Sequence, residues 1–466
     1  MPAGTGMTGR DSAMAIILIL MKPVVLLNVV GLTPRQVGEH TPRIRALADA
    51  GSGVLPMKSA VPAVTCSAQA TMLTGLLPQE HGVVGNGWFH RDTGEVRFWL
   101  QSNALVSGEK IYEAARKRDP KFTCAKVFWW FNQGAAVDWS VTPKPHYGAD
   151  GSKVFDIQST PEGLADELKK RHGDFPFFSF WGPKSGLPSS EWIAKASAEI
   201  IRQKKPGLTL VYLPHLDYGH QRSGPGNPAL LREVDACAGR VLDAASNIDA
   251  AVAIVSEYGI APVSRALFPN RVLREKGLLT ARDGPFGEML DTFGSRAFAV
   301  VDHQVAHVYV REAAAVPEVA EALRPLGSPV AGEARRGIGL ECARAGDIVL
   351  LAPRDAWYAY DFWLDERRAP DFARTVDIHR KPGYDPRELF SIKGAAPRVA
   401  KRLLQKKLGM RYLMDVIPLD AGLVKGSHGL EPSDPMDGAL WACSEKGVRA
   451  EAMTGVKAAV LDLLAR

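Results

Sequence analysis

The chain has 466 residues, of which 46% are hydrophobic and 23% charged, the composition of a folded globular protein and not of a disordered one. Its net charge of +6 is spread over a long chain, which excludes the concentrated basic stripe of a dedicated nucleic-acid binder. The length exceeds what one simple core holds, so we expect either one large α/β domain with an insertion or two domains.

The cysteines indicate a reducing compartment. They are five in number, widely scattered and without CxxC spacing, which argues against a disulfide framework and against a thiolate zinc site. We therefore expect a cytoplasmic protein. The five are Cys66, Cys124, Cys237, Cys342 and Cys443.

An apolar run, MAIILILM, occupies residues 14–21. It is too short for a membrane span, which needs about 20 apolar residues. Arg10 ahead of it would suit a signal peptide, but Lys22-Pro23 leads straight into another apolar run without a small-residue cleavage site. We expect an N-terminal extension over residues 1–21 and no membrane span.

Buried strands and helices then alternate along the chain. Residues 23–30, PVVLLNVV, are a continuous apolar run closed by Gly31, a pattern typical of a parallel strand covered on both faces. The prediction is an α/β fold with a mostly parallel central sheet and helices on both faces. Further strands are expected over 126–130, 208–213 and 251–255, and helices over 42–50, 108–117, 161–172 (Thr160 as N-cap, Pro161 first) and 191–204.

From about residue 268 to 420 the regular alternation of buried strands and helices is lost. This region holds the strand-like runs SRAFAVVD, HVYVRE and DIVLLAP, a helix over 316–323 and an aromatic cluster at 356–363. We expect a smaller mixed α/β cap over 268–420, inserted into a core formed by 22–267 and 421–466. Residues 393–411 are basic and amphipathic; a solvated helix face is favoured there over a membrane or phosphate patch.

The most informative stretch is PAVTCSAQATMLTG, residues 62–75. It places the hydroxyl of Thr65 ahead of a helical run, where free N–H groups and the helix dipole favour an anion. An N-cap without any other role is the alternative for Thr65.

This stretch continues as LLPQEHGVVGN and ends at Asn86. Together with the strand before Gly31 and the later DYGH, SEYG and GSHG pieces, it resembles the alkaline phosphatase superfamily, in particular the nucleotide pyrophosphatase/phosphodiesterase branch. The resemblance covers residues 22 to about 270 and 420–445. It implies that Thr65 attacks phosphorus, that Asn86 steadies a phosphoryl oxygen and that a zinc pair clamps the phosphate.

The resemblance also implies a first zinc site made by an aspartate, a histidine four residues on and a late histidine. Asp217 and His428 match the first and last of these. His220 is the natural third ligand, although it lies three residues after Asp217, and His215 is the fallback. Such donors suit zinc, and manganese or iron would be tolerated. A structural role is the alternative for either histidine.

The second site departs from the family pattern. Val30 stands where the family has an aspartate, and Asn28 lies roughly 6.5 Å back along the strand. Glu257 and Tyr258 replace an Asp-His pair, and a neutral tyrosine, with a pKa of about 10, is a poor ligand. Of the ligands expected in this second site, we expect only Thr65 and Glu257 to remain. The protein as a whole is expected to hold one or two zinc ions. Tyr258 is the candidate to donate a hydrogen bond to the phosphoryl oxygen.

The remaining candidates lie around this site. His379, in DIHRKPGYDP, is expected in a substrate-binding loop, with a role as another metal ligand as the alternative. His81 is expected to brace the nucleophile loop and Cys66 to pack. His303 and His307 are expected in cap strands, His307 in the core or at the surface.

These observations predict a metal-dependent hydrolase of small phosphate esters, either mono- or diesters or pyrophosphates, acting through a covalent threonine intermediate. One alternative is a metal-poor binding or accessory protein that kept the fold. The other is a transferase that passes the phosphoryl group to an acceptor alcohol. No nucleic-acid partner is expected.

Overall fold

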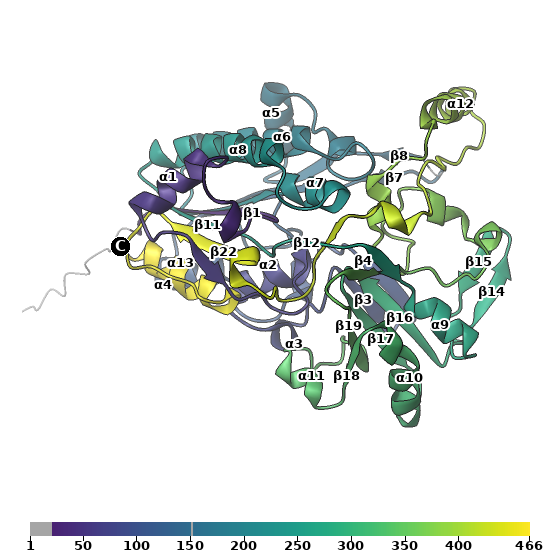
Figure 1. Ribbon diagram of the computed structural model, residues 1–466. Helices are drawn as coiled ribbons and strands as arrows, with labels where there is room; N and C mark the ends of the chain where they lie inside the picture. The colour runs from purple at the N-terminus through teal and green to yellow at the C-terminus, as the bar shows by residue number, and fades with distance from the viewer. Residues whose placement is uncertain (1–20, 151) are drawn as a thin grey trace, which may run out of the picture.

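The computed structural model describes residues 21–150 and 152–466. The N-terminal extension expected over 1–21 therefore lies outside the described residues, apart from Met21. The described chain is built around an eight-stranded sheet, drawn at the left of Figure 1. Its strand order is β2 (Leu55–Met57), β22 (Ala439–Cys443), β11 (Ala251–Val255), β1 (Val24–Val29), β10 (Leu208–Leu213), β5 (Cys124–Val127), β6 (Trp139–Pro143) and β9 (Ile157–Thr160).

The central strands of this sheet are parallel. β1 pairs with β10 and β11, β10 pairs with β5, and β5 pairs with β6, all in parallel. β22 and β9 are antiparallel to their inner neighbours. The predicted mostly parallel central sheet is confirmed.

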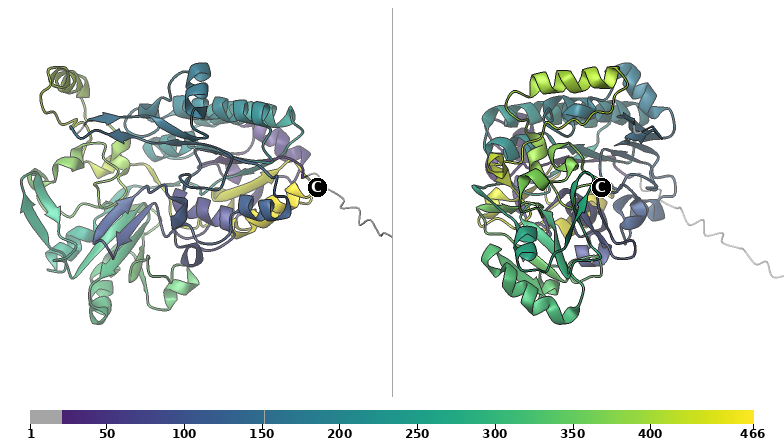
Figure 2. Two further views of the ribbon diagram at one scale, coloured as in Figure 1. Left: turned by 180° about the vertical axis from the view of Figure 1, so that it is seen from behind. Right: turned by 90° about the vertical axis from the view of Figure 1, so that its right-hand side faces the viewer.

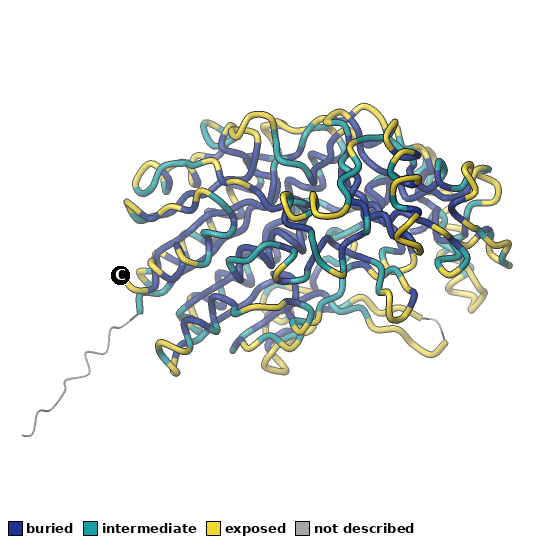
Figure 3. Tube along the Cα trace, turned by 90° about the horizontal axis from the view of Figure 1, so that it is seen from below, coloured by how far each residue is buried: buried dark blue, intermediate teal, exposed yellow. Residues whose placement is uncertain are grey.

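Helices cover both faces, because successive side chains of a buried strand point to opposite sides. Val25, Leu27 and Val29 of β1 belong to the core beneath α1 (Pro42–Ala50), α6 (Leu187–Lys204) and α8 (Pro228–Ser246). Val24 and Leu26 belong to the opposite core, beneath α2 (Thr65–Thr74), α4 (Ile111–Arg118) and α13 (Val456–Leu464). The central strands are buried along their length (Figure 3).

Several element ends differ from the predictions. β5 ends at Val127 and not at residue 130, because Phe128 adopts a left-handed φ of 59° that turns the chain out of the strand. α5 (Leu164–His172) begins after an N-cap at Gly163, so the predicted Thr160–Pro161 start is wrong. Thr160 instead pairs with Ser140 at the sheet edge. α6 begins four residues earlier than predicted, and α4 three residues later.

A second, antiparallel sheet lies to the right of and below the first in Figure 1, and to its lower left in the rear view of Figure 2. It comprises β16 (Ala297–Asp302), β17 (Val305–Val310), β19 (Ile348–Leu351) and β18 (Ser328–Ala331), with α9 (Pro269–Glu275) and α10 (Val316–Leu323) beside it. The hairpin of β3 (Gly87–His90) and β4 (Glu95–Phe98) packs against it, the rings of Phe89 and Phe298 lying 4.9 Å apart. The division into a core and a cap at 268–420 stays a prediction.

The remaining α-helices and strands lie outside these two sheets. They are α3 (Pro78–His81), α7 (His215–Ser223), α11 (Ala334–Gly337), α12 (Ala395–Lys407) and the paired strands β7 (His146–Tyr147) with β8 (Lys153–Val154), β12 (Ala261–Pro262) with β21 (Gly426–Ser427), β13 (Arg265–Leu267) with β20 (Ala356–Tyr358), and β14 (Ala281–Gly284) with β15 (Gly287–Leu290).

Two further observations concern the cysteines and the helices. All five cysteines are free thiols. Within residues 21–150 and 152–466, none of the helices combines the length and the apolar character that a bilayer crossing requires.

Candidate active site

The carboxyl ends of β1, β10 and β11 meet the N-terminus of α2 at one end of the central sheet. In open α/β sheets this edge carries the ligand site. A cavity of about 580 Å³ opens there, with Thr65, Asn86, Asp217 and Tyr258 in its wall. The remaining wall is rich in aromatic side chains, including Trp99, Trp130, Trp181, Tyr212, Tyr218 and Tyr384.

Thr65 is the first residue of α2, and Val64 takes the cap position. The hydroxyl of Thr65 is therefore not an N-cap, and it lies 3.2 Å from the phenol oxygen of Tyr258. Thr65 is 4% exposed and lines the cavity. The predicted nucleophile thus faces the cavity at a helix N-terminus, where the dipole favours negative charge.

Tyr258 joins Thr65 to Asp217. Its phenol donates a hydrogen bond to Oδ1 of Asp217 at 3.2 Å. Because a phenol has a single proton, its oxygen is left to accept the hydrogen bond of the Thr65 hydroxyl. The three side chains form a chain of hydrogen bonds that ends on a carboxylate.

His428, which follows β21, packs against this chain. Its ring stacks on that of Tyr258 with centroids 3.5 Å apart and an interplanar angle of 8°. Nδ1 donates to the carbonyl of Ala63 at 2.8 Å, so Nε2 carries the lone pair, 3.6 Å from Oδ1 of Asp217. Burial lowers the pKa of His428 to about 3, so the ring is neutral.

Gln221 takes the place four residues after Asp217 on α7, where the family pattern has a histidine. Its Nε2 donates to Oδ2 of Asp217 at 2.8 Å, and its Oε1 accepts from the hydroxyl of Tyr384 at 3.0 Å. Sequence reasoning missed Gln221, because an amide carries no metal-ligand signature. Burial raises the pKa of Asp217 to about 6, although the hydrogen bonds from Gln221 and Tyr258 oppose the shift.

Neither histidine proposed as third ligand lines the cavity. His220 lies within helix α7 and not in a loop, and both its ring nitrogens are buried without a hydrogen-bond partner. Burial lowers the pKa of His220 to about 4. Nε2 of His215, the fallback, lies 2.8 Å from a carboxylate oxygen of Glu233 on α8.

The predicted second metal site is a cluster of hydrogen-bonded side chains. Asn28 and Gln69 each donate an amide N–H to Oε1 of Glu257 at 2.6 Å. Val30 is fully buried among apolar side chains. Burial raises the pKa of Glu257 to about 8, so this carboxyl group is mostly protonated at neutral pH.

These donors do not fit a zinc pair. In the described part of the chain, no three His, Cys, Asp or Glu side chains gather into a metal-binding group. Asp217 and His428 come together, whereas His220 stays apart and Glu257 is engaged by two amides. The positions of two further ligands hold an amide and a phenol, which bind Asp217 directly.

Asn86 is held in place from both sides. Its Oδ1 accepts from the backbone N–H of Cys66 at 3.0 Å, and its Nδ2 donates to Oδ1 of Asp302 at 3.1 Å. The other oxygen of Asp302 accepts the backbone N–H of Asn86 at 2.7 Å. Burial raises the pKa of Asp302 to about 7. One amide hydrogen of Asn86 is left to meet a ligand in the cavity.

His303, next to Asp302, is a cavity residue that sequence reasoning missed. It occupies the tight turn between β16 and β17 with a left-handed φ of 61°. Its ring lies between His428 and Tyr384, with centroid distances of 3.6 and 3.8 Å. A non-glycine residue in this conformation is a strained feature that marks functional sites. The sequence signal that could have marked His303 is a two-residue turn without Gly or Asn between two strand-like runs.

The other predicted residues have separate roles. His379 lines the cavity. His81 hydrogen-bonds the hydroxyl of Thr71 on α2 at 2.9 Å, which confirms that it braces the nucleophile segment. Cys66 is buried among apolar side chains, and burial raises the pKa of its thiol, as expected for a packing role. His307 is buried and hydrogen-bonded to the carbonyl of Val84.

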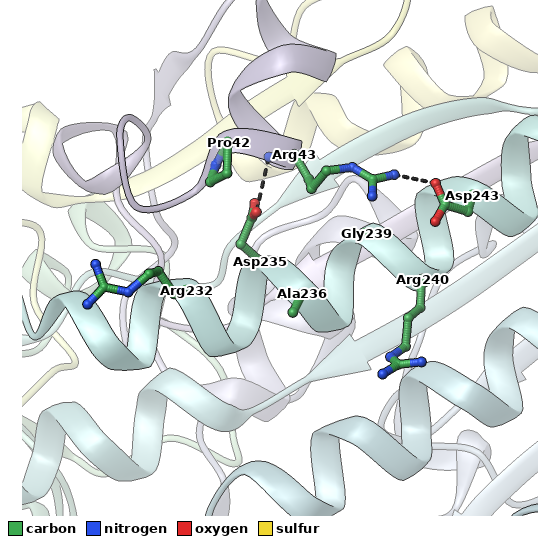
Figure 4. Close-up of a pocket in the computed structure, with 8 residues that line it drawn as sticks. All are labelled: Pro42, Arg43, Arg232, Asp235, Ala236, Gly239, Arg240 and Asp243. Carbon is green, nitrogen blue, oxygen red and sulfur yellow. Dashed lines mark hydrogen bonds and ion pairs between the residues drawn. The ribbon is translucent and has the colours of Figure 1, made fainter.

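A second hollow lies between α1 and α8 (Figure 4). Arg43, Arg232 and Arg240 surround it, but Arg43 pairs with Asp243. The carboxylate of Asp235 already accepts the N–H groups of Arg43 and Ile44 at the start of α1. This helix terminus is therefore satisfied from within the protein.

Comparison with known families decides the ancestry of this site. The family model "Type I phosphodiesterase / nucleotide pyrophosphatase" matches residues 24–385, about three quarters of the chain. The chain belongs to this family. The nucleotide pyrophosphatase resemblance of the Thr65 segment is thereby confirmed.

The individual proteins that match this chain, whether members of the type I phosphodiesterase family or solved structures, are distant from it in sequence. An uncharacterized pyrophosphatase/phosphodiesterase of Schizosaccharomyces pombe is 27% identical over 237 residues, 48% of this chain and 41% of that protein. The match thus spans less than half of this curated relative.

Two solved structures share the fold. Phosphonoacetate hydrolase of Sinorhizobium meliloti, in complex with phosphonoformate, has a TM-score of 0.61 and 15% identity, covering 96% of each chain. Murine ectonucleotide pyrophosphatase/phosphodiesterase 5, an inactive variant in complex with AMP, has a TM-score of 0.55 and 14% identity, covering 95% of each chain.

Proposed function

We propose that this chain hydrolyses a phosphate ester of a small molecule, with Thr65 as the attacking nucleophile. The observation that carries the proposal is the hydrogen-bond chain from Thr65 through Tyr258 to Asp217. A threonine hydroxyl is a weak nucleophile until a base takes its proton. Asp217 is that base, and Tyr258 passes the proton to it.

The first step forms the bond from Thr65 Oγ1 to phosphorus and breaks the bond to the leaving oxygen. The Thr65 proton moves to the Tyr258 oxygen while the Tyr258 proton moves to Asp217. The leaving oxygen takes a proton from solvent. In the second step water attacks phosphorus, the bond from Thr65 Oγ1 to phosphorus breaks, and the water releases a proton to solvent. Asp217 returns its proton through Tyr258 to the departing Thr65 oxygen, which restores the hydroxyl.

Asn86 supports both steps. Its free amide hydrogen donates to a phosphoryl oxygen, and the N-terminus of α2 stabilises the negative charge there. Asp302 positions this amide, because its carboxylate accepts hydrogen bonds from the backbone N–H of Asn86 and from the other side-chain amide hydrogen.

The substrate class follows from the cavity and from the family. A phosphoryl group fits beside Thr65 and Asn86, and the tryptophans and tyrosines suit an apolar or planar remainder. The family description names phosphodiesters and nucleotide pyrophosphates, and the two structural neighbours bind a phosphonate and AMP. A phosphodiester or pyrophosphate is the first choice, with a monoester the second.

The zinc dependence implied by the resemblance is not part of this proposal. Gln221, Val30 and Tyr258 stand where ligands were expected, and Tyr258 occupies the hydrogen-bonding position between Thr65 and Asp217. The same replacements favour a second candidate function, a metal-poor protein that binds phosphorylated compounds without turning them over.

Turnover of bis(4-nitrophenyl) phosphate, with the metal content measured in parallel, separates the two functions. The proposal predicts turnover that survives removal of metal by chelator and that is lost in Thr65→Ala. Equal background rates in the wild type and in Thr65→Ala would instead support the binding function. Turnover that requires a stoichiometric bound metal would contradict the relay as the means of activation.

A further inference from the structure

Helix α12, Ala395–Lys407, stands on the outside of the molecule. None of its residues is buried, and Figures 1 and 2 show the helix projecting from the body. It nevertheless carries large apolar side chains. Leu403, Leu404, Leu408 and Met410 are 52%, 57%, 64% and 53% exposed, respectively.

Three of these side chains lie next to one another on the helix surface. Leu404 and Leu408 are four residues apart and so share a face of the helix, with Leu403 adjoining. Arg411 stacks its guanidinium 5.0 Å above the ring of Phe286, which is itself 49% exposed on the turn between β14 and β15. We define the α12 patch as Leu403, Leu404, Leu408, Met410 and Phe286.

The segment that contains α12 carries charge of a single sign. Residues 393–411 contain seven Lys and Arg and no Asp or Glu. Arg398 and Arg402 pair with Asp415. Among the described residues, no carboxylate lies within ion-pair distance of the lysines of this segment, which are Lys393, Lys401, Lys406 and Lys407.

We propose that α12 docks this protein on an anionic lipid surface. An amphipathic helix with leucines on one side and lysines around them inserts its apolar face at the headgroup boundary, while the lysine stems carry their charges to the anionic headgroups. The charge complementarity selects an anionic partner.

The four exposed aliphatic side chains select a lipid over a nucleic acid, which would leave them in water. The proposal concerns attachment alone and does not rest on the proposed chemistry. The sequence of residues 393–411 favoured a solvated helix face, with a membrane patch as an alternative. We now favour the membrane patch.

Co-sedimentation with vesicles tests the docking proposal. Vesicles of phosphatidylcholine with one quarter phosphatidylserine are compared with vesicles of pure phosphatidylcholine, using the full chain. We expect binding to the anionic vesicles that weakens as salt is raised, and little binding to the neutral ones.

Two variants address the two parts of the patch. Leu404→Ser combined with Leu408→Ser removes apolar contact, and Lys401→Gln combined with Lys406→Gln removes charge. Each pair is expected to lower the vesicle partition coefficient by about tenfold or more. None of the four side chains is buried, so thermal unfolding is expected to match the wild type.

Matched controls lie elsewhere on the surface. Leu364→Ser removes an equally exposed leucine, and Lys170→Gln with Lys276→Gln removes the same charge. These controls are expected to bind as the wild type does. The proposal is overturned if the wild type does not sediment with anionic vesicles, if neutral vesicles bind it equally well, or if the α12 variants sediment like the wild type.

Discussion

Asp302 accepts two hydrogen bonds from Asn86, one from the backbone N–H at 2.7 Å and one from the side-chain amide at 3.1 Å. The two residues are 216 positions apart; Asp302 ends β16, and Asn86 lies in the loop just before β3. The tip of the β16–β17 hairpin is thereby fastened to the loop that carries Asn86. Gln304 strengthens this attachment by donating its backbone N–H to the carbonyl of His428.

Replacing Asp302 by Asn tests its role in positioning Asn86. The substitution keeps the shape of the side chain but removes the charged acceptor, so the amide of Asn86 loses its fixed orientation. Loss of one such donor costs about a hundredfold in kcat. In a double-mutant cycle with Asn86→Ala, we expect strongly non-additive effects on kcat. Additive effects would show that the two residues act independently.

Replacing Tyr258 by Phe removes the phenol that connects Thr65 to Asp217. The ring that stacks on His428 is kept, so the melting temperature should change little. Proton transfer by a positioned group contributes about a hundredfold or more, and kcat is expected to fall by that factor. Tyr218→Phe, in the same cavity wall, is the control and should retain most activity. Unchanged turnover in Tyr258→Phe would exclude the relay.

The pH dependence of kcat/KM reports the protonation of Asp217. Burial raises the pKa of this carboxyl group to about 6, and only the deprotonated form accepts the Thr65 proton. We therefore expect kcat/KM to increase with pH through about 6 and to level off above it. Asp217→Asn should abolish the rise together with the activity. A profile that falls over this range would assign Asp217 the role of an acid.

The stability of the fold should also depend on pH through Glu257. Burial raises its pKa from 4.5 to about 8, so between these values the native state binds more protons than the unfolded state. The free energy of unfolding therefore decreases as pH rises from about 4.5 to 8. Glu257→Gln keeps an acceptor for Asn28 and Gln69 and should reduce this slope in urea unfolding. An unchanged slope would show that Glu257 does not titrate in this range.

Local patterns accounted for the sheet and for the nucleophile helix. The runs at β1, β10 and β11 are mostly apolar, and α2 begins at Thr65, so short stretches of sequence determine these elements. Thr65, Asn86, Asp217, Tyr258 and His428 do lie together, because they follow parallel strands or join the loops at one sheet edge.

The rest of the site depends on distant packing. Gln221 contacts Asp217 because α7 is helical there, which places residues four apart on one face. Asp302 and His303 reach the site because the second sheet folds back onto the first, a relation that no local pattern records. His303 also has a left-handed backbone conformation in its turn, and no sequence pattern marked this position as functional.

Trapping the covalent intermediate tests the central claim, that Thr65 attacks phosphorus, most directly. The protein is mixed with bis(4-nitrophenyl) phosphate, quenched in acid within one turnover and digested for mass spectrometry. The account predicts a 4-nitrophenyl phosphoryl adduct on the Thr65 hydroxyl in the wild type and none in Thr65→Ala. Turnover without any adduct on Thr65, together with undiminished activity of Thr65→Ala, would contradict it.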